Sequence, residues 1–369
     1  MAQASTSESL PSSTVSGTPQ THEVRSPADY PDTDVPPTSS HSLDSCVVEK
    51  LRSVVGERFV LTDPDELMVY ESDALTIHKC PPTAVVIPGS AEEVAAAVKV
   101  LADARVPFAP RGAGTGLSGG ALSRSGSVIF EMARLNRILE IDYENRTATV
   151  EPGVINQHIS QATAPHGFHY APDPSSQSAC TIGGNIAENS GGPHCLKYGM
   201  TTDHILSADV VLPSGDVVTL GGGGIDRPGY DLLGLFVGSE GTFGIAVRAK
   251  VKLTPLPESI QTMLAEFMTV TDASRTVSEI IAAGILPAAL EMMDGATIRA
   301  IENSIFAGGF PTDVAALLII EVDGLAAGLD GISEVVQRIC LQNNARAVRV
   351  AKDESERLKL WAARKRAFG

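Results

Sequence analysis

Three glycine-rich segments constrain this chain more than any other feature. They cover residues 110–120 (PRGAGTGLSGG), 171–192 (APDPSSQSACTIGGNIAENSGG) and 238–244 (GSEGTFG), and each lies next to an apolar pattern typical of a strand. Glycine lets the backbone adopt positive φ angles and approach a ligand without a Cβ atom in the way. Three such segments predict one extended ligand that is contacted from three sides.

Composition limits the partners. The 369 residues are 43% hydrophobic, which is enough for two globular domains and a tail. A formal charge of -16 argues against nucleic-acid binding, so an anionic ligand must be held locally by backbone N–H groups and a few cations. The five Cys residues include no Cys-x-x-Cys pair, which is typical of reduced thiols and predicts a cytoplasmic protein. No apolar run approaches the roughly 18 residues of a membrane span.

Residues 1–45 are rich in Ser, Thr, Pro and acidic residues and resemble neither a signal peptide nor a transit peptide, so we expect a disordered tail. Residues 46–255 read as a mixed α+β unit that carries all three glycine-rich segments. Its expected helices begin near residues 43, 90 and 154, and its expected strands are 83–88, 106–109, 127–132, 138–142, 147–151, 205–212, 217–220 and 244–253.

Residues 256–369 alternate strands and helices, which predicts a second α+β domain whose helices cover one face of a sheet. Its expected strands are 263–268, 288–293, 315–322 and 345–351, and its expected helices are 273–283, 295–303, 332–342 and one from 355. The last helix ends abruptly, with Trp361 expected to be exposed, so we expect this domain to be incomplete.

The first segment contains the dinucleotide-type spacing Gly-x-Gly-x-x-Gly at residues 114–119. A Rossmann site also needs a helix that starts within the motif and an acidic residue about 20 positions later. Neither is present, and the missing Gly-Lys-Ser/Thr excludes a P-loop. An anion-binding nest with Arg111 beside it remains, and pyrophosphate is its natural occupant. A plain surface turn and an NAD-dependent Rossmann enzyme stay open as alternatives, and a yellow protein would exclude the latter.

These segments, together with 194–199 (HCLKYG), 228–233 (PGYDLL) and 291–294 (EMMD), resemble the FAD-linked 2-hydroxy-acid dehydrogenases, from about residue 55 to the last residue. This family includes the FAD-binding subunits of bacterial glycolate oxidases and the D-lactate dehydrogenases. The resemblance implies an α+β fold with a two-subdomain FAD-binding domain of the PCMH or vanillyl-alcohol-oxidase type over 46–255. An α+β cap, or substrate, domain follows over 256–369 and is expected to be incomplete.

The resemblance also implies which residues contact FAD. The pyrophosphate would lie against Pro110, Arg111, Gly112, Ala113, Gly114, Thr115, Gly116, Leu117, Ser118 and Gly119, and the adenosine near Pro152 and Gly153. The flavin and ribityl chain would lie against Pro172, Asp173, Ser175, Cys180, Thr181, Gly183, Gly184, Asn185, Ala187, Asn189 and Gly191. The adenine and ribose side would be closed by Glu240, Gly241, Gly244 and Ile245. Because residues 112–119 contain no His for a covalent link, we expect noncovalent FAD.

Candidates for the chemistry are fewer. Arg364 matches a family position that pairs with the substrate carboxylate, and the alternative is a solvated charge on a basic helix. His194 and His204 are candidate bases, although packing or hydrogen-bonding roles are favoured for both. Cys180 is expected to be a small packed residue. Similar enzymes bind a divalent metal through a His-rich motif beyond the point where this chain ends, so no metal ligands are assigned here.

The sequence therefore predicts FAD-dependent oxidation of a small 2-hydroxy acid, glycolate or D-lactate, to the 2-keto acid by hydride transfer to flavin N5. We expect little or no turnover from the 369-residue chain. Implied partners are an iron–sulfur subunit and a quinone or other electron acceptor, with membrane contact only through such partners. The alternative is a non-catalytic flavin-binding subunit or fragment whose site is completed by a partner chain.

Overall fold

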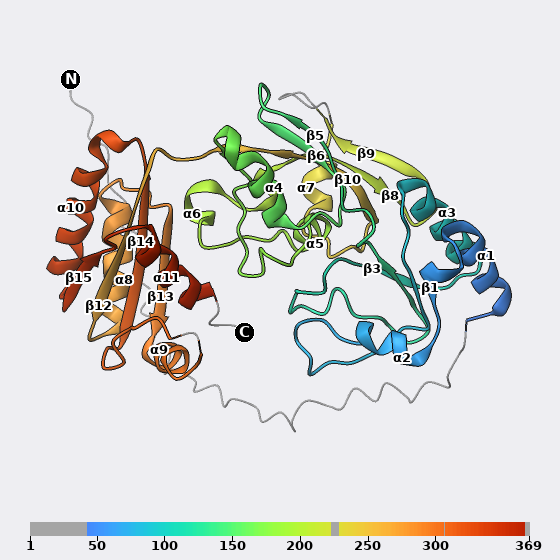
Figure 1. Ribbon diagram of the computed structural model, residues 1–369, viewed down its shortest axis with the longest axis horizontal. Helices are drawn as coiled ribbons and strands as arrows, with labels where there is room; N and C mark the ends of the chain where they lie inside the picture. The colour runs from blue at the N-terminus through green and yellow to red at the C-terminus, as the bar shows by residue number, and fades with distance from the viewer. Residues whose placement is uncertain (1–42, 223–228, 306, 366–369) are drawn as a thin grey trace, which may run out of the picture. The chain divides into compact units, whose positions relative to one another are not determined.

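The computed structural model describes residues 43–222, 229–305 and 307–365 (Figure 1). Most of the expected tail lies outside the described residues. Helix α1 (Ser45–Val55) opens the described part, with Asp44 as its N-cap and Gly56 at its end. The expected helix near residue 43 is therefore confirmed.

The first sheet has the order β1-β2-β4-β3 and is formed by Val60–Leu61, Ala84–Val86, Val128–Glu131 and Phe108–Arg111. Strands β2 and β3 both run parallel to β4, and helix α3 (Ala91–Asp103) connects them. The Ser90 hydroxyl caps α3 by accepting from the Glu93 N–H at 3.2 Å, while the Glu93 carboxylate accepts from Gly89 N–H. This sheet and its two helices share one apolar core.

The second sheet is antiparallel, with the order β5-β6-β10-β8-β9. Its strands are Ile138–Asp142, Thr147–Val150, Ile245–Lys252, Ile205–Val211 and Val217–Gly221. The predicted hairpin between β8 and β9 is confirmed. Helices α4 (Asn156–Thr163), α5 (Ile182–Glu188) and α7 (Leu232–Phe236) contribute to its core.

Short elements connect these parts. The helices among them are α2 (Pro64–Leu67), α6 (Cys195–Tyr198), η2 (Glu57–Phe59), η3 (Met68–Tyr70), η4 (Ala164–His166) and η5 (Thr201–Asp203). Strand β7 (Phe168–His169) pairs with β11 (Thr254–Pro255), which leads into the third sheet.

The third sheet is antiparallel, with the order β13-β14-β12-β15. Its strands are Ala289–Asp294, Ala316–Gly324, Ser259–Phe267 and Ala347–Val350, and its helices are α8 (Val270–Ala282), α9 (Gly295–Glu302), α10 (Ala326–Gln342) and α11 (Glu354–Lys365). All four strands and four helices predicted for this part are present, with shifted ends.

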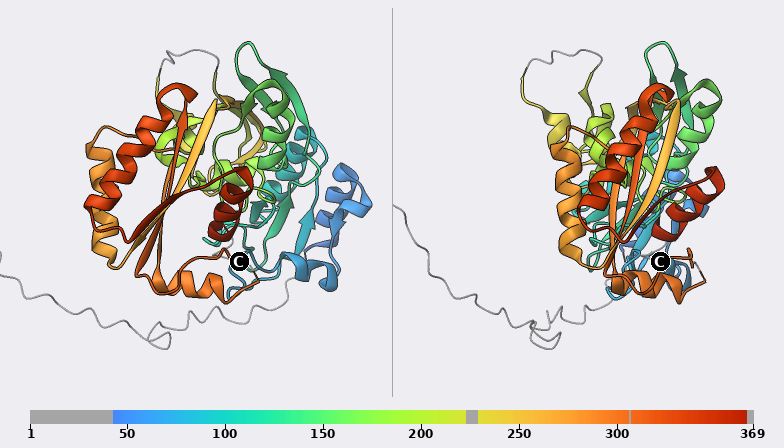
Figure 2. Two further views of the ribbon diagram at one scale, coloured as in Figure 1. Left: turned by 60° about the vertical axis from the view of Figure 1, so that its left-hand side comes forward. Right: turned by 90° about the vertical axis from the view of Figure 1, so that its left-hand side faces the viewer.

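Helices cover both faces of this sheet, so the prediction of one covered face was wrong. Along β14, Leu318 and Ile320 pack into the core under α8 and α10, whereas Leu317 and Ile319 pack into the core that includes α9 and α11. Successive side chains of a strand point to opposite faces, so an unbroken apolar run is buried on both. Figure 2 shows α8 and α10 on one side of the sheet and α11 on the other.

The prediction that Trp361 is exposed was also wrong. Its side chain is 5% exposed and belongs to the core with α9, so it is buried rather than exposed. None of the helices in the described ranges is long and apolar enough to cross a membrane.

Candidate functional site

A cavity of about 670 Å³ lies where the glycine-rich segments meet. The first segment lines it from the end of β3, the second through α5 and the residues before it, and the third through the residues that lead into β10. Asp73, Ala74 and Lys365 add to the lining from other parts of the chain. Cofactor pockets typically measure about 300–1,000 Å³, so this cavity has a suitable size.

Most residues predicted to contact a cofactor line this cavity. They are Pro110, Arg111, Gly112, Ala113, Gly114, Thr115, Gly116, Leu117, Ser118, Pro152, Ser175, Cys180, Thr181, Gly183, Gly184, Asn185, Ala187, Glu240, Gly241, Gly244 and Ile245. The predicted residues outside the lining are Gly119, Gly153, Pro172, Asp173, Asn189 and Gly191.

Several of these outer residues support the walls instead. The Gly119 N–H donates to the Asp73 carboxylate at 2.9 Å, which ties the first segment to a lining residue. Asn189, with φ of 47°, ends α5 as its C-cap. The Pro172 carbonyl accepts a hydrogen bond from the buried Asn156 amide at 3.0 Å.

Other lining residues were not named singly as cofactor contacts. Six of them lie within the three predicted segments: Gly120, Ser176, Ile186, Glu188, Ser190 and Ser239. The sequence gave no signal for those outside the segments, which are Asp73, Ala74, Ala121, Met132, Phe236, Ala246 and Lys365. The residues around Asp73 contain no glycine-rich pattern, and they contact the first segment through hydrogen bonds from Ala74 N–H to the Gly116 carbonyl and from Gly119 N–H to the Asp73 carboxylate.

Arg111 lies beneath the first loop. Its side chain is 9% exposed, its Nε lies 3.9 Å from the Glu131 carboxylate, and its Nη1 donates to the Ala121 carbonyl at 3.3 Å. Gly114 has φ of +66°, and a Cβ there would lie 2.3 Å from Arg111 Nη2. Burial raises the pKa of Glu131 to about 7 against the opposing attraction of Arg111. The guanidinium thus supports the loop and borders the cavity.

The glycines also let the three walls pack on one another. A Cβ on Gly183 would lie 2.8 Å from the Pro152 Cβ, and one on Gly241 would lie 2.6 Å from Pro110 Cγ. The Glu240 N–H donates to the Ala187 carbonyl at 2.9 Å, which joins the third segment to α5. Glycine here serves wall-to-wall contact as well as access to the cavity.

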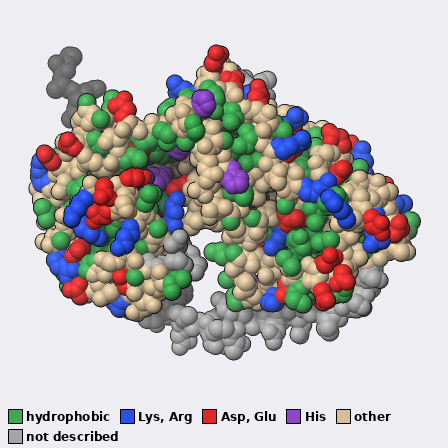
Figure 3. Space-filling model, in the orientation of Figure 1, with side chains coloured by type: hydrophobic (Ala, Val, Ile, Leu, Met, Phe, Trp, Pro, Cys, Tyr) green, Lys and Arg blue, Asp and Glu red, His purple; other side chains and the backbone are tan. Residues whose placement is uncertain are grey.

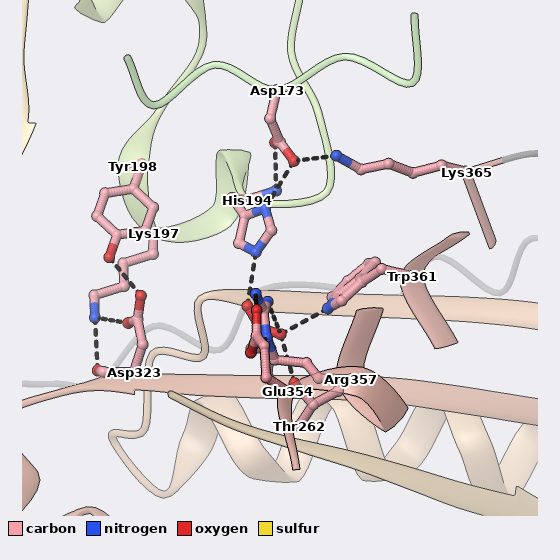
Figure 4. A network of polar contacts seen from close by, with 11 residues as sticks. Asp173, His194, Lys197, Tyr198, Thr262, Asp323, Glu354, Arg357, Trp361 and Lys365 are labelled. Carbon is pink, nitrogen blue, oxygen red and sulfur yellow. Dashed lines mark hydrogen bonds and ion pairs between the residues drawn. The ribbon is translucent and has the colours of Figure 1, made fainter. Parts of the chain in front are cut away.

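A buried polar junction joins the second segment to the third sheet (Figure 4). His194, just before α6, places Nδ1 2.9 Å from Asp173 Oδ2 and Nε2 2.9 Å from Glu321 Oε1 on β14. Lys365 Nζ lies 3.0 Å from the same Asp173 oxygen. We call Asp173, His194, Glu321 and Lys365 the polar junction. Figure 3 shows His, acidic and basic side chains gathered in the recess where these parts meet.

His194 is a cation at neutral pH. Burial alone would lower its pKa, but its hydrogen bonds and charge attraction to Asp173 and Glu321 raise the pKa to about 9. Burial opposes ionisation of Glu321 as well, yet hydrogen bonds from His194, Thr262 and Trp361 lower its pKa to about 2. Both ring nitrogens of His194 therefore donate to carboxylates, so His194 holds no lone pair with which to accept a proton.

Further donors hold Glu321. Its Oε2 accepts from the Thr262 hydroxyl at 2.5 Å, from the Trp361 indole at 2.6 Å and from Arg357 at 3.3 Å. Nearby, Asp323 on the same strand accepts from Lys197 and from the Tyr198 hydroxyl. The contact between β14 and the 194–198 segment is thus charged along its length.

The other predicted candidates lie elsewhere. Arg364 does not line the cavity, and its Nε and Nη2 lie 2.9 and 2.5 Å from Glu291 Oε2, so it is an ion-paired side chain rather than a solvated charge. His204 is buried, with Nε2 2.8 Å from the Tyr198 carbonyl, and does not line the cavity. Cys180 is buried in the cavity wall, where burial raises the pKa of its thiol. Among the described residues, no group of three or more His, Cys, Asp or Glu side chains could hold a metal ion.

The fold is shared with several solved structures. Alkyldihydroxyacetonephosphate synthase superposes with a TM-score of 0.73 and 23% identity, covering 86% of this chain and 62% of that one. p-Cresol methylhydroxylase superposes with a TM-score of 0.72 and 19% identity, covering 86% of this chain and 68% of that one. The class is therefore the PCMH-type, vanillyl-alcohol-oxidase-like fold.

Sequence comparison gives the family. Residues 82–221 match the FAD binding domain, and residues 256–369 match the C-terminal domain of FAD linked oxidases. The chain belongs to the FAD-linked oxidase family.

Three relatives show how far the match extends. Glycolate oxidase subunit GlcD of Escherichia coli (strain K12) is 48% identical over 322 residues, which are 87% of this chain and 64% of that protein. GlcD of Bacillus subtilis (strain 168) is 44% identical over 87% of this chain and 68% of that protein. A D-lactate dehydrogenase of Anaerostipes hadrus is 33% identical over 86% of this chain and 68% of that protein. This chain spans less than two thirds of the E. coli subunit.

Proposed function

We propose that this chain binds FAD noncovalently and serves the oxidation of a small 2-hydroxy acid, glycolate or D-lactate, to the 2-keto acid. One observation carries the proposal: three glycine-rich segments converge on one cavity, and the first two of them lie within residues 82–221, which match the FAD binding domain. The names of the GlcD and D-lactate dehydrogenase relatives support the substrate class.

The residues present fit the cofactor. Glycine backbone in the first segment and the buried Arg111 guanidinium suit a pyrophosphate, because backbone N–H groups and a cation stabilise that anion without bulky side chains. The second segment and α5 would hold the flavin and ribityl chain, and residues 240–245 would close the adenine side. FAD, once bound, would supply the acceptor for the hydride from C2 of the acid.

The chain's own part in the reaction is binding and orientation. Oxidation also removes the hydroxyl proton, and no His side chain lines the cavity among the described residues. His194 already donates from both ring nitrogens, so we do not assign it as the base. The described residues offer no set of three or more metal ligands.

The lack of a His in the described lining favours a second candidate, a flavin-binding subunit whose catalytic site is completed by a partner chain. The GlcD relatives are named as subunits, which supports this form of the proposal. An iron–sulfur subunit, with a quinone or other acceptor for the electrons, is the kind of partner we propose. Any membrane contact would pass through such a partner.

The test begins with the purified chain and its visible spectrum. We expect a yellow protein that releases all its flavin when denatured, so the intact mass carries no flavin. Anaerobic glycolate or D-lactate should bleach the flavin slowly or only after a partner is added. A colourless protein that cannot be loaded with FAD would contradict the proposal. Rapid bleaching by the isolated chain would contradict the partner-dependent form alone.

A further inference from the structure

Behind the first glycine-rich segment lies a carboxylate for which the proposed function gives no role. Glu131 ends β4 and is paired with Arg111, the last residue of β3, in the parallel register of these strands. The two side chains are 11% and 9% exposed, and Arg111 lines the cavity whereas Glu131 does not. Arg111 is therefore shared between a buried carboxylate and the site proposed for the pyrophosphate.

The contact between these two charges is loose. The nearest atoms, Arg111 Nε and Glu131 Oε2, lie 3.9 Å apart, which is beyond the range of an N–H···O hydrogen bond. By contrast, the buried carboxylate of Glu151 accepts from Arg137 Nη2 at 2.7 Å. A guanidinium carries five N–H donors, so Arg111 can bind an anion in the cavity without moving away from Glu131.

Glu131 is the group in this cluster that can change its charge near neutral pH. Burial raises its pKa to about 7 against the attraction of Arg111, so it exchanges a proton there. Tyr70 on η3 faces the same pair, with its ring centre 5.8 Å from Arg111 Cζ. Burial and the charge of Glu131 raise the pKa of Tyr70, so its hydroxyl stays neutral. Glu66 on α2 acts on Tyr70 and adds a further negative charge to this side.

A bound pyrophosphate changes the balance around Arg111. Before it binds, the Glu131 carboxylate is the counter-charge of the buried guanidinium. The pyrophosphate competes with Glu131 for this cation, and two anions in a buried site repel each other more strongly than in water. Protonation of Glu131 removes that repulsion and leaves the guanidinium to the ligand.

We propose that Glu131 takes up a proton from solvent when the FAD pyrophosphate binds to Arg111, so that cofactor binding and proton uptake are coupled. The inference rests on the proposed function for the identity of the ligand. Glu131 acts through Arg111 and does not line the cavity, so it is a positioning residue. FAD affinity should fall as the pH rises through about 7, whereas below about pH 6 Glu131 is already protonated and the dependence levels off.

The experiment measures the dissociation constant of FAD from the full chain at pH 6 and at pH 8, by the fluorescence of released flavin. The FAD pyrophosphate itself does not titrate in this range. From pH 6 to pH 8 the wild type should lose roughly fivefold to tenfold in affinity, as one group with a pKa of about 7 produces. Glu131→Gln, which resembles the protonated side chain, should match the wild type within about twofold at pH 6 and bind FAD roughly fivefold to tenfold more tightly than the wild type at pH 8.

Two further variants test whether the effect belongs to Glu131. Glu131→Asp should retain the pH dependence, because it keeps a carboxylate beside Arg111. Glu151→Gln is the matched control: it removes a buried carboxylate that is also paired with an Arg but lies outside the cavity lining, so the wild-type pH dependence should remain. Loss of the pH dependence in Glu151→Gln would overturn the assignment to Glu131.

Other outcomes separate the inference from the proposed function. Wild-type FAD affinity that is equal at pH 6 and pH 8, or equally pH-dependent in Glu131→Gln, overturns the inference and leaves the proposed function standing. Weaker binding by Glu131→Gln at both pH values would give Glu131 a structural role only and overturns the inference as well.

If the wild type binds no FAD, the proposed function fails, and ADP-ribose decides the inference, because it carries the same pyrophosphate without the flavin. Tighter ADP-ribose binding at pH 6 than at pH 8 in the wild type, absent in Glu131→Gln, would support the coupling. Any other result with ADP-ribose overturns it.

Discussion

The walls of the cavity are made largely of backbone, whereas the polar junction beside it is made of charged side chains. In the walls, glycines allow three segments to approach one another more closely than a Cβ would permit. In the junction, two carboxylates and two cations alternate in a part of the molecule where Asp173 and Glu321 are buried. The packing of the walls therefore requires that side chains be absent at the glycines. The stability of the junction requires that all of its charged side chains be present.

The two regions therefore differ in the substitutions that they tolerate. An added methyl group in the walls produces a steric conflict that does not depend on pH. Removal of one charged side chain in the junction leaves its buried partner without an opposite charge. The resulting loss of folding free energy depends on the protonation state of the remaining groups, and therefore on pH. Single substitutions in each region should therefore have different effects.

The largest effect is expected from Gly183→Val. An added Cβ would lie 2.8 Å from the Pro152 Cβ and 3.2 Å from its carbonyl oxygen, so the wall must shift where the flavin is proposed to bind. We expect FAD affinity to fall by roughly two orders of magnitude, equivalent to about 3 kcal/mol. The flavin content of the purified variant measures this.

The matched control is Gly331→Val, on the exposed side of α10, where an added Cβ meets nothing within 4 Å. It should retain FAD as the wild type does. Normal flavin content in Gly183→Val would mean that the walls are looser than their backbone contacts indicate.

His194→Gln should cause the next largest loss. It removes a cation held between two buried carboxylates, and because Lys365 and Arg357 still face these carboxylates we expect a loss of about 2 kcal/mol, below the roughly 3–5 kcal/mol of a fully broken buried pair. Urea unfolding of the two proteins at pH 6 measures it. The double variant with Glu321→Gln should lose less than the sum of the two single losses, and additivity would count against a direct interaction.

The same variant gives the pH dependence its sign. The folded state raises the pKa of His194 from 6.5 to about 9, so it binds the proton more tightly than the unfolded state. The stabilisation is complete below pH 6.5 and is lost as the pH rises through about 9. The difference between wild type and His194→Gln should shrink over that window. A difference that stays constant would contradict a charged His194.

Ser118→Ala tests a side-chain contact within the backbone walls and should have the smallest effect. The Ser118 hydroxyl donates to both oxygens of Glu188 at 2.7 and 2.8 Å and joins the first segment to α5 at an exposed position. We expect a loss of about 0.5–1 kcal/mol in unfolding free energy and a few-fold decrease in FAD affinity. A loss as large as that of Gly183→Val would erase the distinction between the two regions.

Most strands and helices could be predicted because their signals are local. The apolar runs and the helix cap at Ser90 are patterns of neighbouring residues. The structure has a strand or helix at each predicted apolar run, and Ser90 caps α3. Helix α5 was missed because its sequence, IGGNIAE, is rich in poor helix formers. It forms because Ile182 and Ile186 are buried in the core under the second sheet, which is a tertiary effect.

The second sheet-covering layer and the burial of Trp361 were missed for a similar reason. The unbroken apolar run of β14 indicates burial on both faces, but α11, one of the two helices that cover the second face, follows β14 only after α10 and β15. Trp361 is buried because its indole reaches Glu321, 40 residues earlier in the chain. A pattern read in a short window cannot supply that partner.

The glycine-rich walls follow from the sequence alone, because conformational freedom and the lack of a Cβ belong to each glycine wherever it is placed. The polar junction follows from the way the chain folds. Its contacts join residues 21, 127 and 192 positions apart. A charged side chain pairs with an opposite charge that packing places beside it, and the sequence does not show which one that is. The same physics directs Arg364 to Glu291 and places Lys365, one residue later, in the cavity wall.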